Sequence, residues 1–321
     1  MAFAQPYTFT NLQNYLRVAE LTKSQYLKRE ILCYSLIGTP CDLLTITGVG
    51  LGKKKGVVLT GRVHPGESVS SWMMQGVIDF LLSEDKMAEY LRRKFIFKIV
   101  PMVNPDGVIQ GNYRTSLAGY DLNRRYTSPS KILHPTIFHT KKMAKQFAKS
   151  CPLILYCDFH GHSKSKNVFM YGNTSEDSPE QYRIFPYIMS KMCTHFSFKD
   201  SKFVVQKSKT STARVVMWKE LGISSVFTIE ASFFGPGNRE DNPQFSIQDL
   251  MDIGKSMCQA LAVYNKIIEA KDSLLADNNK IYKVRRINSI QSRDIAINIM
   301  KEIKENKNFL CSCISSAYSF K

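Results

Sequence analysis

The stretch Val57-Val58-Leu59-Thr60-Gly61-Arg62-Val63-His64-Pro65-Gly66-Glu67-Ser68 decides the fold, because it takes a buried strand through a tight loop into a helix. Its first four residues are apolar or β-branched, which is typical of a strand, and Pro65-Gly66 turns the chain. Beyond the turn, apolar residues recur at helical spacing. His64 and Glu67 are therefore predicted to lie in a strand-to-helix loop, where α/β enzymes place their chemistry.

An imidazole and a carboxylate held this close are suitable ligands for one divalent metal ion such as zinc. Two ligands do not complete a site, so a third must come from elsewhere in the chain. The competing interpretation is an ordinary surface turn, because His-x-x-Glu is a short pattern that occurs by chance. The remainder of the sequence has to decide between the two.

The composition is that of a globular protein, and the length is enough for one large α/β domain or two small ones. The chain has 321 residues, of which 44% are hydrophobic and 22% charged. It has no run of eighteen apolar residues, which predicts no membrane span, and residues 1–6 do not resemble a secretory signal. Eight dispersed cysteines without a Cys-x-x-Cys pair predict the reduced thiols of an intracellular protein rather than a disulfide framework.

The charge is strongly basic, with 44 lysines and arginines against 27 acids and a net charge of +17. Such a surplus of positive charge is informative about binding partners rather than about the fold. The partner could be a nucleic acid, an acidic membrane face or an acidic polypeptide. The sequence has no helix-turn-helix, zinc-finger or RNP-type module. We therefore predict no nucleic-acid partner and leave an acidic polypeptide open.

The order of predicted elements indicates the fold class. Residues 1–35 read as helical, with further helices at 69–82, 136–149, 179–196, 212–220 and 247–273. Strands are predicted at 31–37, 43–47, 57–60, 95–103, 153–159, 167–171 and 225–229. This alternation favours an α/β fold with a mixed, largely parallel central sheet flanked by helices. One domain over 1–275 and a basic, helical or poorly ordered appendage over 276–321 are expected.

Polar side chains follow the ends of several predicted strands. In an open α/β sheet such loops converge on one edge. His64, Glu67 and His160 would then form a two-histidine, one-carboxylate zinc site with an open fourth position. Asp158 is placed to orient a ligand histidine from behind.

Glu230 arrives on the apolar strand 225–229, where a carboxylate is costly unless it is paired or catalytic. It would suit a general base that activates water at the metal, although a strand-end carboxylate satisfied by a lysine or an amide is the alternative. Arg114 is a candidate for stabilising an oxyanion. Asn123 and Arg124 are candidates for holding a substrate carboxylate. Either arginine alone would be interpreted as a solvated surface residue. Only the combination of these residues with the candidate metal ligands indicates a site.

These motifs together resemble the M14 family of zinc metallocarboxypeptidases and, within it, the cytosolic carboxypeptidases. The resemblance covers roughly residues 1–270, and the motifs occur in the family's order. They are Arg62-Val63-His64-Pro65-Gly66-Glu67, Val103-Asn104-Pro105-Asp106-Gly107, Gly111-Asn112-Tyr113-Arg114, Asp121-Leu122-Asn123-Arg124, Asp158-Phe159-His160-Gly161-His162 and Thr228-Ile229-Glu230-Ala231-Ser232-Phe233.

The resemblance implies a role for each matching residue. One zinc ion would be bound by His64, Glu67 and His160, and Glu230 would be the general base and acid. Arg114 would polarise the scissile carbonyl, while Asn123 and Arg124 would hold the terminal carboxylate. Members of the subfamily remove glutamates from protein C-termini or side-chain polyglutamate branches, notably on tubulin.

Arg214 precedes the Glu230 strand, near the place where the wider family builds its specificity pocket. We expect it to meet an acidic substrate side chain, with a structural salt bridge as the competing interpretation. The sequence departs from the family in two respects. Digestive relatives carry a mobile tyrosine where this chain has Lys207-Ser208-Lys209, and the subfamily usually has a β-sandwich domain before the catalytic domain.

The expectation from sequence is therefore a zinc carboxypeptidase that removes glutamates from acidic protein tails, with polyglutamylated tubulin as partner. A cytoplasmic, microtubule- or cilium-associated location follows from the same resemblance. Two other functions remain open. One is a catalytically silent microtubule-binding module of the same fold, and the other is a small-molecule N-acyl amino acid deacylase.

Overall fold

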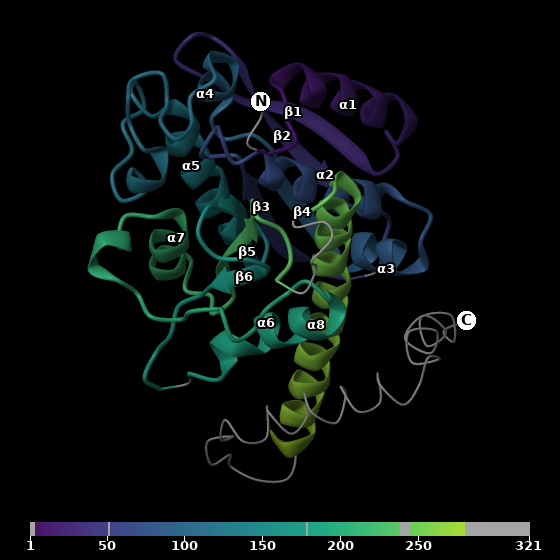
Figure 1. Ribbon diagram of the computed structural model, residues 1–321. Coiled ribbons are helices and arrows are strands. Elements are labelled where there is room, and N and C mark those ends of the chain that lie inside the picture. The colour runs from purple at the N-terminus through teal and green to yellow at the C-terminus, as the bar shows by residue number, and fades with distance from the viewer. Residues whose placement is uncertain (1–3, 51, 178, 238–243, 280–321) are drawn as a thin grey trace.

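The computed structural model describes residues 4–50, 52–177, 179–237 and 244–279. Figure 1 shows one central sheet with helices against both of its faces, and the long helix α8 runs along one side. No helix within these ranges is long and apolar enough to cross a membrane.

Within the described ranges the sheet has seven strands, in the spatial order β1-β2-β4-β3-β5-β7-β6. The four central strands are parallel, whereas β1, β2 and β6 join antiparallel at the edges. The mixed, largely parallel sheet expected from the sequence is thus confirmed. The strands are β1 (Leu27–Tyr34), β2 (Pro40–Ile46), β3 (Lys55–Gly61), β4 (Phe95–Val100), β5 (Leu153–His162), β6 (Val168–Tyr171) and β7 (Val226–Ser232).

The helices bury the two faces of the sheet unequally. The larger apolar cluster lies under α1, α2, α3, α6 and α8, and the smaller lies under α5 and α7. Neighbouring strand residues alternate between the clusters, as Leu59 and Val58 do. The helices are α1 (Phe9–Thr22), α2 (Ser68–Leu82), α3 (Lys86–Lys94), α4 (Pro105–Gln110), α5 (Pro135–Ser150), α6 (Gln181–Met192), α7 (Ala213–Leu221) and α8 (Ile247–Asn279), with 3₁₀ turns η1 (Leu122–Arg124) and η2 (Lys207–Lys209).

The helix that follows the first candidate metal-ligand motif, α2, is held by a close helix crossing. A Cβ at Gly76 of α2 would lie 2.1 Å from the carbonyl oxygen of Met251, and a Cβ at Gly254 of α8 would lie 2.0 Å from that of Met73. Glycine is therefore required at both positions for the two backbones to approach. This contact fixes α2, and with it the loop that precedes it, against the body of the domain.

The strand register positions the polar residues at one edge of the sheet. The strands β3, β5 and β7 are parallel neighbours, so their carboxyl ends lie together. His160 of β5 is the register partner of Glu230 on β7. Gly61, the last residue of β3, is the partner of Phe159. This edge is where an open α/β sheet places its ligand site.

Several sequence expectations about local structure were wrong. Residues 1–35 are not one helical segment, because α1 ends at Thr22 and β1 begins at Leu27. The helix α3 was not predicted. Both His160 and Glu230 lie within their strands rather than in the loops that follow. The appendage expected over 276–321 remains a prediction, since α8 continues to Asn279 and residues 280–321 lie outside the described residues.

Candidate active site

The loop between β3 and α2 is fixed by a buried arginine. Arg62 has a left-handed backbone with φ of 57°. Its Nε donates to the carbonyl oxygen of Pro65 at 2.7 Å and its Nη1 to Ser71 Oγ at 2.8 Å. Gly66 N donates to the carbonyl oxygen of Tyr113 at 2.7 Å, and a Cβ at Gly66 would lie 2.7 Å from that oxygen. The turn thus has little freedom.

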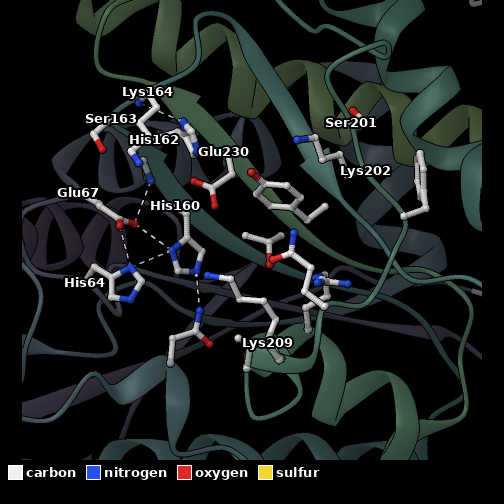
Figure 2. A pocket seen from close by; sticks show the side chains of 18 of the residues that line it. His64, Glu67, His160, His162, Ser163, Lys164, Ser201, Lys202, Lys209 and Glu230 are labelled. Atoms are coloured by element: carbon white, nitrogen blue, oxygen red, sulfur yellow. Dashed lines mark hydrogen bonds and ion pairs between the residues drawn. The ribbon is translucent and has the colours of Figure 1, made fainter.

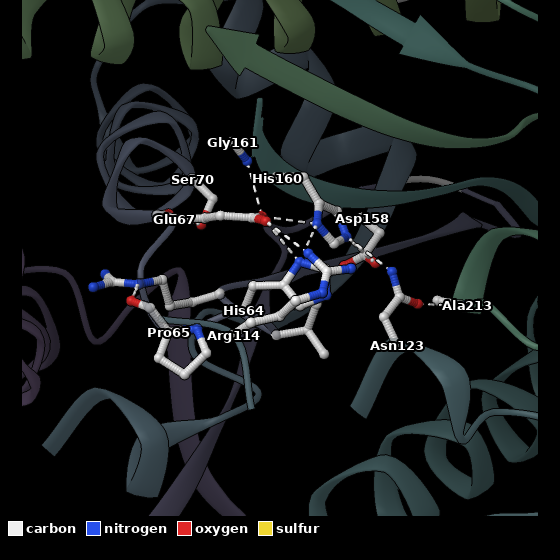
Figure 3. Close-up of polar contacts among 12 residues, drawn as sticks. His64, Pro65, Glu67, Ser70, Arg114, Asn123, Asp158, His160, Gly161 and Ala213 are labelled. Atoms are coloured by element: carbon white, nitrogen blue, oxygen red, sulfur yellow. Dashed lines mark hydrogen bonds and ion pairs between the residues drawn. The ribbon is translucent and has the colours of Figure 1, made fainter. Parts of the chain in front are cut away.

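Three buried side chains meet beside this loop, as Figure 3 shows. Glu67 Oε1 lies 2.7 Å from His64 Nδ1, and Glu67 Oε2 lies 2.9 Å from His160 Nδ1. The two Nδ1 atoms are 3.2 Å apart. Gly161 N donates to Glu67 Oε2 at 2.9 Å. The structure therefore brings together His64, Glu67 and His160, which lie far apart in the sequence.

Two aspartates hold the imidazoles from outside. Asp158 Oδ2 lies 2.8 Å from His160 Nε2, while its Oδ1 accepts a hydrogen bond from Thr60 Oγ1 at 2.6 Å. Asp121 Oδ1 lies 3.2 Å from His64 Nε2. Each imidazole is thus oriented by a carboxylate on one nitrogen so that Nδ1 points inward, the usual arrangement around a bound metal.

The three side chains fit a zinc ion by their donor chemistry. They offer two nitrogens and one carboxylate oxygen within 4.8 Å of one another, and all three residues are buried. Burial opposes ionisation of Glu67, but the two imidazoles outweigh it and hold the pKa of Glu67 well below its ordinary value. Burial likewise disfavours protonation of His160, yet Asp158 and Glu67 raise its pKa well above its ordinary value. The carboxylates around the two imidazoles therefore stabilise a positive charge at this cluster.

Glu230 points into the same cavity from β7 (Figure 2). It is 9% exposed, and its Oε2 is buried without a hydrogen-bond partner among the described residues. Burial raises its pKa to about 8, with His160 opposing the shift and Glu67 adding to it. A carboxyl group with such a pKa can both take up and return a proton near neutral pH.

Arg114 lies beside the candidate metal ligands and is only half buried. Its Nε and Nη2 each lie 2.9 Å from Asp121 Oδ2, and its Nη1 lies 3.8 Å from Glu67 Oε1. The guanidinium thus reaches the site while a carboxylate holds it from behind.

Asn123 and Arg124 lie on η1, whose first turn is capped by Asp121. Asn123 Oδ1 accepts from Ala213 N at 2.9 Å, and its Nδ2 lies 3.3 Å from His160 Nε2. Arg124 Nη1 donates to the carbonyl oxygen of Asn123 at 3.0 Å. Both residues line the cavity.

Arg214 is buried at the start of α7 and also lines the cavity. Its Nη1 donates to the carbonyl oxygen of Gly172 and, at 2.7 Å, to Asn173 Oδ1. Burial lowers its pKa to about 10, so it stays charged at neutral pH. No carboxylate within the described residues forms a salt bridge with it. The competing interpretation of Arg214 as one half of a structural salt bridge therefore finds no partner in that part of the chain.

The cavity has a volume of about 930 Å³ and a strongly basic lining. Its only carboxylates among the described residues are Glu67 and Glu230. Eight lysines and arginines from the described part of the chain line it, namely Arg114, Arg124, Lys164, Arg183, Lys199, Lys202, Lys209 and Arg214. Sequence reasoning missed five of these, because Lys164, Arg183, Lys199, Lys202 and Lys209 are scattered over separate loops and helices with no motif around them.

Known proteins give the class of this chain. Residues 12–225 match the family described as zinc carboxypeptidase, so the chain belongs to that family. The matched range contains all three candidate ligands and ends five residues before Glu230. Its relatives within the family include cytosolic carboxypeptidases. Cytosolic carboxypeptidase 2 of Xenopus tropicalis is 49% identical over 276 residues, which are 82% of this chain and 28% of that protein.

Cytosolic carboxypeptidase 3 of Bos taurus is 46% identical over 82% of this chain and 27% of its own length. The chain thus spans less than a third of these relatives. Solved structures agree in fold: a metallo-carboxypeptidase from Burkholderia cenocepacia superimposes with a TM-score of 0.74 at 23% identity, covering 83% of this chain and 71% of that one. A metallo-carboxypeptidase from Pseudomonas aeruginosa gives 0.72 at 24% identity, covering 82% and 70%.

Proposed function

We propose that this chain is a zinc-dependent carboxypeptidase that removes glutamates from acidic protein tails, with polyglutamylated tubulin as its substrate and the cytoplasm, at microtubules or cilia, as its location. The observation that carries the proposal is the basic cavity around the candidate metal site. Eight cationic side chains against two carboxylates would attract a polyanionic chain and disfavour a basic one. The cytosolic names of the relatives support the location.

The substrate's terminal residue would be held by three groups. Arg124 and Asn123 would take the terminal carboxylate, since a guanidinium offers two parallel donors to it. Arg214 would meet the glutamate side chain, because it is charged, buried and, among the described residues, bonded only to neutral acceptors. This triplet of contacts would select both a free carboxyl end and an acidic last residue.

The reaction is hydrolysis of the last peptide or isopeptide bond. Zinc held by His64, Glu67 and His160 would supply Lewis-acid polarisation of the water and the carbonyl. Glu230 would accept a proton from the attacking water and return it to the leaving amine nitrogen, as its pKa of about 8 allows. Arg114 would stabilise negative charge on the carbonyl oxygen.

The test is mass spectrometry of defined peptides after incubation with the zinc-loaded protein. The substrates are a linear chain ending in several glutamates, a glutamate-branched chain and a length-matched chain ending in glutamines. Release of glutamate at a rate at least ~100-fold above release of glutamine is expected, corresponding to loss of a charge-assisted contact of about 3 kcal/mol. Equal rates on the linear glutamate chain and the glutamine chain would overturn the substrate assignment.

The same experiment, with an N-acyl glutamate added as a fourth substrate, separates the competing functions. Faster cleavage of an N-acyl glutamate than of either peptide would indicate a small-molecule deacylase. Zinc binding and peptide binding without any released amino acid would indicate a silent binding module.

A further inference from the structure

Two cysteines that the proposed function does not use face each other across the first hairpin of the sheet. Cys33 on β1 and Cys41 on β2 are direct partners in the antiparallel register. Cys41 is 1% exposed, and Cys33 is half buried against the same apolar cluster. Both side chains therefore point to the same face of the sheet, so the two sulfurs are neighbours.

The antiparallel pairing of Cys33 with Cys41 suits the geometry that a disulfide needs. Opposed residues of an antiparallel pair have Cα atoms about 4.5–5.5 Å apart, and disulfides span about 4.4–6.8 Å. The hairpin tip is closed without the cysteines, since Ser35 N donates to the carbonyl oxygen of Thr39 at 2.9 Å and Thr39 N donates to Ser35 Oγ at 2.9 Å. The register is thus held in the reduced state, and bond formation requires no refolding of the hairpin.

The two thiols differ in a way that suits stepwise chemistry. Cys33 lies on the edge strand and is partly accessible, and its hydrogen bond with Cys41 lowers its pKa. That hydrogen bond and burial together raise the pKa of Cys41 well above its ordinary value, and its Sγ donates to the carbonyl oxygen of Met102 at 3.6 Å. Cys33 is therefore the thiol that reacts first with a dissolved reagent, and Cys41 is the thiol placed to attack it afterwards.

The other described cysteines lack these features. Burial raises the pKa of each of them, and the one that lies on a strand, Cys157, is opposed by Leu59 and Phe227. The remaining three are Cys151, Cys193 and Cys258. They serve as internal controls within the same molecule.

We propose that Cys33 and Cys41 are a modification site, at which a reversible cross-strand disulfide forms by exchange with a small disulfide such as oxidised glutathione. The Cys33 thiolate attacks one sulfur of the reagent, breaks its S–S bond and releases one glutathione thiolate. The Cys41 thiol gives its proton to solvent, and its sulfur attacks that of Cys33 and releases the second glutathione. Two electrons pass from the two thiols to the reagent, so an added dithiol reverses the reaction.

The experiment uses the whole folded 321-residue chain incubated with oxidised glutathione. Free thiols are then blocked with N-ethylmaleimide, and the protein is digested without reduction by chymotrypsin, which can cut between the two cysteines after Tyr34 and Leu36. Mass spectrometry should find the peptides of Cys33 and Cys41 joined, with loss of two hydrogens, and dithiothreitol should separate them. In the reduced protein, Cys33 should be alkylated at least ~10-fold faster than Cys157. Cys33→Ser should abolish the cross-link, and Cys151→Ser should leave it unchanged.

Cys41→Ala should trap Cys33 as its glutathione adduct, which tests the order of the two steps even if the cross-link is lost for structural reasons. Circular dichroism checks that each variant is folded. Wild-type protein unfolded in urea should give mixed pairings instead of the single cross-link. The proposal is overturned if the folded wild type gives no Cys33–Cys41 cross-link, or if Cys33 pairs equally with the other cysteines.

Discussion

At the scale of single residues, the candidate site consists of groups whose orientation is set by buried partners. Asp158 is fully buried and holds both His160 Nε2 and the hydroxyl of Thr60. Its effect on the inner nitrogen is indirect, because it fixes the ring and the tautomer.

Asp158→Asn should therefore weaken zinc binding by about 10- to 100-fold, as loss of such partners does in other metal sites. Competition with a chelator of known affinity measures this change. Asp42→Asn serves as the control, since that buried carboxylate pairs with Arg29 and neither residue lines the cavity. Unchanged zinc affinity in folded Asp158→Asn protein would show that the aspartate does not orient the ligand.

Glu230 gives a prediction about pH and stability in the metal-free protein. Its pKa rises from 4.5 to about 8 on folding, chiefly by burial. Below pH 4.5 the Glu230 carboxyl is protonated in both the folded and the unfolded protein, so it does not lower the free energy of unfolding. Between 4.5 and about 8 only the unfolded chain releases the proton, so stability falls as the pH rises, and above about 8 the loss is complete.

Glu230→Gln removes this titration. The Tm of the chelator-treated variant should exceed that of the wild type by an amount that grows from about pH 5 to about pH 8 and then levels off. Differential scanning calorimetry across that range measures it. A difference in Tm that is constant with pH would contradict the raised pKa.

At the scale of secondary structure elements, the sequence predicted those whose pattern is local and strong. The β3–loop–α2 unit was recognised because its buried strand, its turn residues and its helical spacing all agree. The strand β1 was misread, because Lys28, Arg29 and Glu30 give it no clear alternation and it becomes a strand by pairing with β2. The helix α3 was missed although Asp85 caps it, because only Ala88, Leu91 and Arg92 of its nine residues are buried.

The crossing of α2 and α8 gives a prediction at this scale. Gly76→Ala places a methyl group 2.1 Å from a backbone oxygen, so it should destabilise the fold by about 2–3 kcal/mol as overpacking does. Urea unfolding followed by circular dichroism measures the change. The matched control is Gly222→Ala, where φ is 68° with no atom within 4 Å, and the cost should be only about 1 kcal/mol. Equal costs would show that the crossing is not tight.

At the scale of the whole molecule, the meeting of His64 and His160 was predictable because parallel strands deliver their carboxyl ends to one edge. The basic lining of the cavity was not predictable in detail. The excess of +17 indicated an acidic partner but not where the charge lies. Lys164, Lys202 and Lys209 come together only through the path of the chain between β5 and α7.

The concentration of charge predicts a salt dependence. The Debye length is about 8 Å near physiological ionic strength and shortens as salt is added. Attraction of a polyanionic substrate to the cavity should therefore weaken with salt. The KM for a chain ending in several glutamates should rise several-fold between about 50 and 300 mM sodium chloride, with little change in kcat. A chain ending in glutamines should show no such rise, and equal salt sensitivity of both substrates would contradict the role assigned to the cavity.

The proposed chemistry depends on two imidazoles and a carboxylate that hold one zinc ion while Glu230 moves the proton. Metal content and glutamate release, both determined on a single preparation of Glu230→Gln, separate these two roles. We expect one zinc per chain, as in the wild type, with turnover lowered by about 10²- to 10⁴-fold. Full turnover in the zinc-loaded variant would show that Glu230 is not the group that moves the proton.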